Sequence, residues 1–182
     1  MSKISIFGEK QGGMSLVEII VATSIISILS SVALPNVFEF LNHAAIRSER
    51  LALIQDIRVT RFKAISHRRP AYLCALNATG SCARQIHWNQ GWMAYIDNNL
   101  NNIYDDGDEQ FIHHKNTMQN NNIDIIIHAR WQDIKFDGRG VLRRSGHFRV
   151  CNPEIPGEQS MQVIRMNTYG RLAIETDELP CE

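Results

Sequence analysis

The chain carries no net charge and lacks the spacings typical of metal sites and of enzymes. Its 182 residues include 19 basic and 19 acidic side chains. This equal number of opposite charges argues against a general polyanion binder. Its four cysteines include no Cys-x-x-Cys pair, so the common zinc sites are missing. His113, His114 and His128 do not have the spacing of metal ligands, and no Ser-His-Asp or Cys-His arrangement is evident. We therefore predict no enzyme, no bound metal and no other cofactor.

Charge is almost absent from one segment near the N-terminus. Between Leu16 and Val37 the single charged side chain is that of Glu18, and an apolar stretch of about 20 residues suffices to cross a bilayer. An ionisable group inside such a segment costs ~2.5–3.5 kcal/mol on insertion scales. We expect residues 14–37 to span a membrane and Glu18 to find a partner there. The alternative is that Glu18 reaches back to the membrane surface.

Glycine and proline are absent from the segment that follows. Residues 38–65 contain many good helix formers, and Pro70 follows a cluster of cations typical of a helix end. We predict one helix over residues 14–68, which Pro35 kinks or loosens by one turn. Its second half is amphipathic, with an apolar face expected to contain Ile54, Ile57, Phe62 and Ile65.

The remaining residues, 69–182, are predicted to form a β-rich globular domain. Runs of strand-forming residues alternate with turns that often contain glycine, and their even spacing indicates antiparallel pairing. The expected strands are residues 71–76, 84–88, 91–96, 110–114, 123–130, 134–136, 147–151, 162–167 and 171–175. The predicted fold class is α+β: a long N-terminal helix whose amphipathic half packs on an antiparallel β-sheet.

The junction before the apolar segment resembles the class III signal of type IV pilins and type II secretion pseudopilins. It has the sequence Lys10-Gln11-Gly12-Gly13-Met14-Ser15-Leu16-Val17-Glu18. An ordinary secretory signal is cut after its apolar core, which is then lost, whereas a cut here keeps the helix. The resemblance implies that residues 1–13 are a leader removed by prepilin peptidase after Gly13, and that Met14 is N-methylated. A plain membrane anchor is the alternative, but it gives no reason for an acid so deep in the segment.

The same resemblance implies assembly roles for Glu18 and Pro35. Glu18 would lie at mature position five and pair with the α-amine of a neighbouring Met14, while Pro35 matches a proline common at mature position 22. Inside a dry helical bundle, each charge left unpaired is costly. A pair of this kind would therefore set the axial register between subunits.

Three stretches of the C-terminal part resemble the H-type pseudopilins and related minor pilins, the GspH/FimT/FimU-like group. The stretches are residues 91–109, residues 134–140, and residues 147–151 followed by 161–166 and 170–173. The resemblance implies a single-pass subunit in the bacterial inner membrane with its globular domain in the periplasm. It also implies a minor pilin or pseudopilin that helps to prime and assemble the filament tip together with other pilins. Type IV pili and type II secretion systems share this architecture, so the sequence is compatible with either system.

All four cysteines lie beyond the predicted helix. An even number in an exported segment favours two disulfides. Of the three possible pairings we favour Cys74 with Cys82, which closes a hairpin-sized loop, and Cys151 with Cys181, which ties down the C-terminal tail.

The polar loop of residues 97–109 has some features of a calcium site. Asp97, Asn99 and Asn101 occupy positions one, three and five of an EF-hand-like spacing, but position six is Asn102 and position twelve is Asp108. The EF-hand has glycine and a bidentate glutamate there. The pattern therefore favours a solvated hairpin loop whose Asn and Asp side chains bond their own backbone.

The stretch from Arg130 to Arg171 has an excess of four positive charges. Such a cluster could hold DNA through its phosphates, and DNA uptake in transformation is the alternative function. Some related minor pilins bind DNA through a Gly-Arg-x-Arg element. Here Gly170-Arg171 is followed by Ala173 at the second arginine position and then by an acidic tail, which repels phosphate. The candidate contacts are Arg139, Arg143, Arg144 and Arg171.

Overall fold

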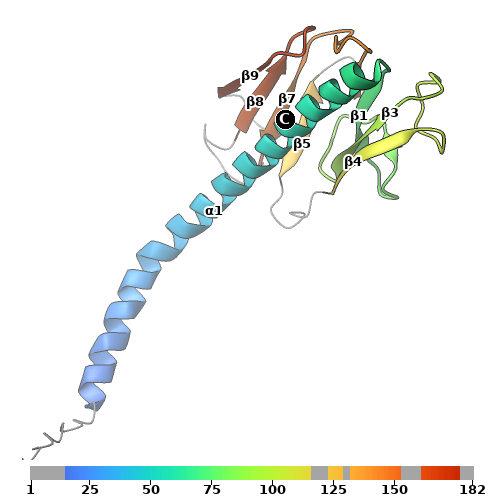
Figure 1. The fold of residues 1–182 in the computed structure, drawn as a ribbon. Helices are drawn as coiled ribbons and strands as arrows, with labels where there is room; N and C mark the ends of the chain where they lie inside the picture. The colour runs from blue at the N-terminus through green and yellow to red at the C-terminus, as the bar shows by residue number, and fades with distance from the viewer. Residues whose placement is uncertain (1–14, 116–122, 129–131, 153–160, 177–182) are drawn as a thin grey trace, which may run out of the picture. The chain divides into compact units, whose positions relative to one another are not determined.

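The computed structural model describes residues 15–115, 123–128, 132–152 and 161–176, without the side chains of residues 32–36, 38, 39, 128 and 176. The chain divides into two compact units, residues 1–40 and residues 41–182. Helix α1 (Leu16–His67) contributes to both (Figure 1).

In the first unit, α1 begins at Leu16, directly after Ser15. The carbonyl of Ser15 accepts the N–H groups of Glu18 and Ile19, at 3.0 and 3.2 Å, which closes the first turn. Apolar side chains are exposed along this half, as Leu16 and Leu29 illustrate at 73% and 65%. The hydroxyls of Thr23, Ser24, Ser27 and Ser31 are paired within the helix, because they donate to backbone carbonyls three or four residues earlier.

Within the described residues, no helix combines the length and apolar character needed to cross a membrane. The expected span, residues 14–37, includes Met14 and the side chains of residues 32–36, which lie outside the described part of the chain.

In the second unit, α1 ends at His67, one residue before the predicted end. Arg68 adopts the left-handed conformation with φ 53°. The N–H of Arg68 bonds the carbonyl of Ile65, and that of Arg69 bonds the carbonyl of Ala64, both at 3.2 Å. These two bonds are the Schellman pattern, so the helix is closed by a specific cap with arginine in the position that usually holds glycine.

The strands form two antiparallel sheets (Figure 1). The first sheet contains β1 (Ala71–Leu76), β2 (Cys82–Ala83), β3 (Gly91–Ile96), β4 (Glu109–Lys115) and β6 (Asp133–Phe136). Its strand β1 is central: β3 pairs along one edge, while β2 and β6 pair with its two halves. The second sheet has the order β5 (Asp124–His128), β7 (Gly146–Cys151), β8 (Met161–Met166) and β9 (Leu172–Thr176).

The expectation of a strand over residues 84–88 is wrong. The strand that follows the turn is β2, and it has only two residues. Residues 84–88 instead leave the first sheet for the second: the N–H of Trp88 bonds the carbonyl of Ile125, and the N–H of Ile127 bonds that of Ile86. Residues 84–88 therefore bond to β5 instead of forming a strand of their own.

One hydrophobic core lies between the second half of α1 and both sheets. Ile46, Leu53 and Ile57 of the helix are at most 1% exposed and belong to the same cluster as Trp92 and Phe148 of the sheets. Full burial of such side chains contributes about 1.5–3 kcal/mol each. This packing confirms that the amphipathic half of the helix covers antiparallel sheets, although it covers two of them.

The predicted apolar face of the helix is half correct. Ile54 and Ile57 are buried, but Phe62 and Ile65 are 66% and 44% exposed. Phe62 follows the buried Ile57 by five residues, a step that turns about 140° beyond one full turn, so its side chain points away from the face of Ile57. The buried face continues instead through Thr60 and Ala64.

Candidate functional site

The predicted processing site lies outside the described residues, since Gly13 and Met14 belong to the segment that the structure does not describe. Glu18 lies in the first turn of α1, where a carboxylate interacts favourably with the helix dipole. Pro35 lies within α1, which is helical on both sides of it. The roles of these four residues in cleavage, methylation and assembly stay predictions.

The Cys74–Cys82 disulfide is present and joins β1 to β2 across a short turn. Within the turn, the side-chain oxygen of Asn77 accepts the N–H groups of Thr79 and Ser81 at 3.0 and 2.9 Å. Cys151 is disulfide-bonded as well. Its expected partner, Cys181, lies outside the described residues.

The loop of residues 97–109 is held by its own side chains. The buried carboxylate of Asp97 accepts the backbone N–H groups of Asn101 and Asn102, at 3.2 and 3.0 Å. The amide groups of Asn99 and Asn101 both donate to Asp105, and the hydrogen bond from Asn99 is the main cause of the lowered pKa of Asp105. The side chains proposed as calcium ligands are thus engaged within the loop, as the hairpin interpretation predicts.

The two described histidine side chains of this set have separate partners. His113 lies 2.9 Å from the amide nitrogen of Gln110, and His114 lies 3.2 Å from a carboxylate oxygen of Glu49. The side chain of His128 lies outside the description. In the part of the chain that is described, no three metal-ligating side chains lie together.

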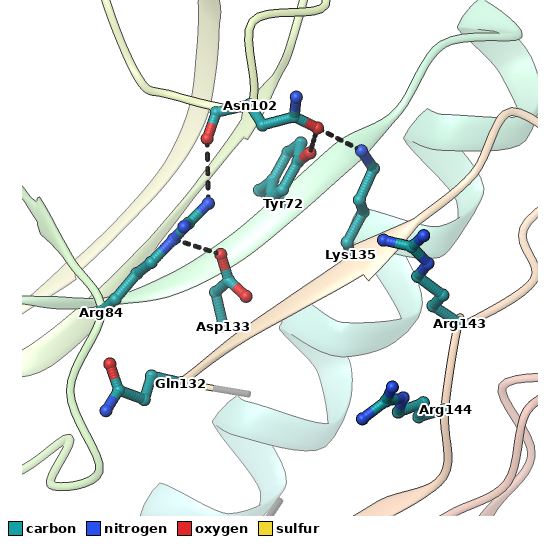
Figure 2. Close-up of a pocket in the computed structure, with 8 residues that line it drawn as sticks. All are labelled: Tyr72, Arg84, Asn102, Gln132, Asp133, Lys135, Arg143 and Arg144. Atoms are coloured by element: carbon teal, nitrogen blue, oxygen red, sulfur yellow. Dashed lines mark hydrogen bonds and ion pairs between the residues drawn. The ribbon is translucent and has the colours of Figure 1, made fainter. Parts of the chain in front are cut away.

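A polar pocket of about 860 Å³ opens on the first sheet (Figure 2). Its lining combines four cations with one carboxylate. The residues are Tyr72, Arg84, Asn102, Gln132, Asp133, Lys135, Arg143 and Arg144. They come from β1, β6, the loop before β4 and the segments flanking the strands, so the fold brings together residues far apart in the sequence.

Asn102 organises one side of this pocket. Its backbone adopts the left-handed conformation, with φ 65°, which asparagine tolerates better than most residues. Its side-chain oxygen accepts the hydroxyl of Tyr72 at 2.6 Å and the ammonium of Lys135 at 2.5 Å. Its carbonyl accepts Arg84 at 3.1 Å, and the same guanidinium donates to Asp133 at 3.1 Å. Burial raises the pKa of Tyr72 above its ordinary value.

The structure brings together only two of the four arginines predicted to contact DNA. Arg143 and Arg144 line the polar pocket. Arg139 forms an ion pair with Asp137 at 3.1 Å in its own turn, and Arg171 lines a separate depression beside β8 and β9. Contact of these arginines with DNA stays a prediction.

Sequence analysis missed the other cations of the pocket, Arg84 and Lys135. A usable signal lay in β6, where Ile134 and Phe136 are buried. Because side chains alternate across a strand, Asp133 and Lys135 had to share the outer face. No local pattern indicated that Arg84 would meet them.

Comparison with known proteins gives a consistent assignment. Residues 51–170 match the family of the type II transport protein GspH, and residues 9–34 match the prokaryotic N-terminal methylation motif. No curated protein sequence matches the chain.

Two solved structures resemble the fold, both crystal forms of the type IV minor pilin FimU from Pseudomonas aeruginosa. One has a TM-score of 0.50 at 16% identity, over 72% of this chain and 90% of that chain. The other has a TM-score of 0.49 at 15% identity, over 75% and 92%. The former supports the α+β pilin fold. Because the family match spans more than half of the sequence, the chain belongs to the GspH family of type II transport proteins and carries a prepilin-type methylation signal.

Proposed function

We propose that this chain is a minor pilin or pseudopilin that helps to prime and assemble the tip of a type IV pilus or a type II secretion pseudopilus. The observation that carries the proposal is the first half of α1. It exposes apolar side chains such as Leu16, Ile20 and Leu29, directly after a methylation motif. A helix of this kind needs an apolar environment, which lipid or neighbouring pilin helices supply.

The proposal places the subunit in the inner membrane before assembly, with its globular part in the periplasm. Prepilin peptidase would cut after Gly13, and methylation would follow at Met14. Disulfides persist in oxidising compartments such as the periplasm, and the Cys74–Cys82 bond agrees with that location. Its partners are then other pilins, the peptidase and inner-membrane lipid.

Glu18 is proposed as the register contact of the assembled helices. It is the only acid between Leu16 and Val37 and lies in the first turn of the helix. Once packed among apolar helices, its carboxylate needs a cation to offset desolvation. The α-amine of a neighbouring Met14 would supply it after cleavage.

The test is removal of residues 14–37 from the mature subunit, with the secretion signal replaced so that the domain still reaches the periplasm. We expect a folded domain that is absent from sheared filaments, whereas the full-length subunit is recovered there. Recovery of the truncated subunit in filaments at the full-length level would refute assembly through this helix.

A nucleic-acid receptor for transformation has weaker support. The predicted contacts Arg139 and Arg171 lie outside the pocket that holds Arg143 and Arg144, and the second arginine of the Gly-Arg-x-Arg element is Ala173. A salt titration of DNA binding tests it, because phosphate contacts weaken steeply as salt rises.

A further inference from the structure

We propose that the polar pocket lined by Arg84, Lys135, Arg143 and Arg144 receives an acidic segment of a neighbouring pilin subunit. The inference rests on the proposed function, since it names a contact made during filament assembly. Its basis is the charge of the pocket, the partners that its cations already have and the shape of the site.

The cations of the pocket divide into two kinds. Arg84 donates to Asp133 and to the carbonyl of Asn102, and Lys135 donates to the side chain of Asn102. Arg143 and Arg144, by contrast, form no hydrogen bond or ion pair with any residue that the structure describes. Figure 2 shows both guanidinium groups turned toward the strand that carries Asp133 and Lys135. Two charged groups thus face a recess without an ion-pair partner among the described residues.

The pocket is organised before a partner arrives. Asn102 fixes Arg84, Lys135 and the hydroxyl of Tyr72 at once, and Lys135 lies 4.9 Å from the centre of the Tyr72 ring. Asn102 is itself held through its N–H by the buried Asp97. Ordering of side chains is one of the costs of association, and prior organisation lowers it.

The chemistry of the lining favours a peptide carboxylate over a nucleic acid. Arginine guanidinium groups form paired hydrogen bonds with carboxylates. Asp133, Asn102 and Gln132 add acceptors and amide donors that suit a peptide backbone. A nucleic-acid strand follows a track of cations, yet Arg139 and Arg171 lie outside this recess.

The experiment uses the full-length subunit in its native host with the photo-crosslinking amino acid benzoylphenylalanine in place of Gln132. Gln132 is exposed, lines the pocket and forms no bond with the described residues. After irradiation, crosslinked peptides are identified by mass spectrometry in both the membrane fraction and the sheared filaments. We expect a peptide of another pilin subunit that contains Asp or Glu.

Charge reversal supplies the specificity control. Arg143→Glu or Arg144→Glu should lower the crosslink yield roughly tenfold, because like charges then face each other. Arg171→Glu makes the same change of charge outside the pocket and should leave the yield unchanged. A compensating Asp or Glu to Arg substitution in the crosslinked peptide should restore the yield with Arg144→Glu.

Several outcomes would overturn the inference. They are a crosslink to nucleic acid, a crosslink to this chain's own acidic residues 177–182, a peptide without acids, and no crosslink in either fraction. Incorporation into filaments is scored separately, so a subunit that assembles without the crosslink contradicts only the pocket. A subunit that forms the membrane crosslink but never enters filaments contradicts only the filament role.

Discussion

The two halves of α1 use apolar side chains in opposite ways. In residues 16–40, side chains such as Leu29 are exposed and serine and threonine hydroxyls bond the helix's own backbone. In residues 41–67, side chains such as Leu53 are buried against the sheets, while the outer side carries both charged residues such as Arg58 and apolar ones such as Phe62. The apolar side chains of the first half are therefore available to contact other molecules. Those on the inner face of the second half pack into the domain's own core.

This difference predicts that the first half of α1 serves assembly and the second half serves folding of the domain. Substitutions in the first half should change filament incorporation and leave the domain's stability intact. Substitutions on the buried face of the second half should do the reverse. Four experiments test this separation, ordered from the largest expected effect to the smallest.

The largest effect is expected from Glu18→Gln. Removing one member of a buried ion pair costs about 3–5 kcal/mol, so recovery in sheared filaments should fall by more than about a hundredfold. Thermal unfolding of the domain should not change, since Glu18 lies in the exposed first turn. Normal recovery of the variant in filaments would contradict the register contact. A lowered unfolding temperature would contradict the division of α1 into an assembly half and a folding half.

Two matched leucine substitutions come next. Leu53→Ala should lower the free energy of unfolding by about 2–5 kcal/mol, because a buried leucine leaves a cavity. Leu29→Ala, at a position 65% exposed, should change it by less than about 0.5 kcal/mol. Denaturant titration of both full-length variants in the same detergent measures the difference. Equal losses of stability would show that the two halves do not differ.

A smaller effect should appear as pH dependence in the second half. The hydrogen bond to Glu49 is the main cause of the raised pKa of His114, with Asp56 adding to it. This stabilisation is complete below the ordinary histidine pKa of about 6.5 and is lost as pH rises through the higher folded value. The free energy of unfolding, measured by urea titration, should therefore fall between about pH 6 and 8, by about 1 kcal/mol or less.

His114→Gln should abolish most of that pH dependence, whereas His113→Gln, one residue away and bonded to Gln110, should retain it. A steeper loss in the His114 variant than in the parent would show that another group controls the transition.

The smallest effect is expected for Phe62→Ala. Phe62 lies in the folding half but is 66% exposed, so the free energy of unfolding should change by less than about 0.5 kcal/mol. Equilibrium unfolding measures it against Ile57→Ala, where 1% exposure predicts a loss of about 2–5 kcal/mol. A large loss in the Phe62 variant would mean that the outer side of the second half also stabilises the domain.

Local patterns predicted most elements of the fold. Strands β1 and β3 match their predicted ranges end to end, because each is an apolar run bounded by turns. Residues 84–88 were misassigned because a strand needs a partner, and theirs lies in the other sheet. The local sequence does not indicate which sheet a segment will pair with.

The polar pocket is less predictable from the sequence than the fold. Arg143 and Arg144 stood out through charge alone, but their companions Arg84 and Lys135 come from distant segments. The role of Asn102 depends on a left-handed backbone, visible in the sequence only as a departure from the EF-hand pattern. The sequence thus reveals a cluster of charges. Which of these charges line the pocket and which lie elsewhere on the surface depends on how the strands are arranged.

The connection between α1 and β1 has a mechanical consequence. Only residues 68–70 separate the helix from β1, and the capped Arg68 lies so close to Gly138 that an added Cβ there would come within 2.7 Å of its backbone. Strand β1 is hydrogen-bonded along both edges. Tension on the helix therefore enters the domain at a strand that is hydrogen-bonded on both sides. Unravelling the domain from this point requires the hydrogen bonds on both edges of β1 to break.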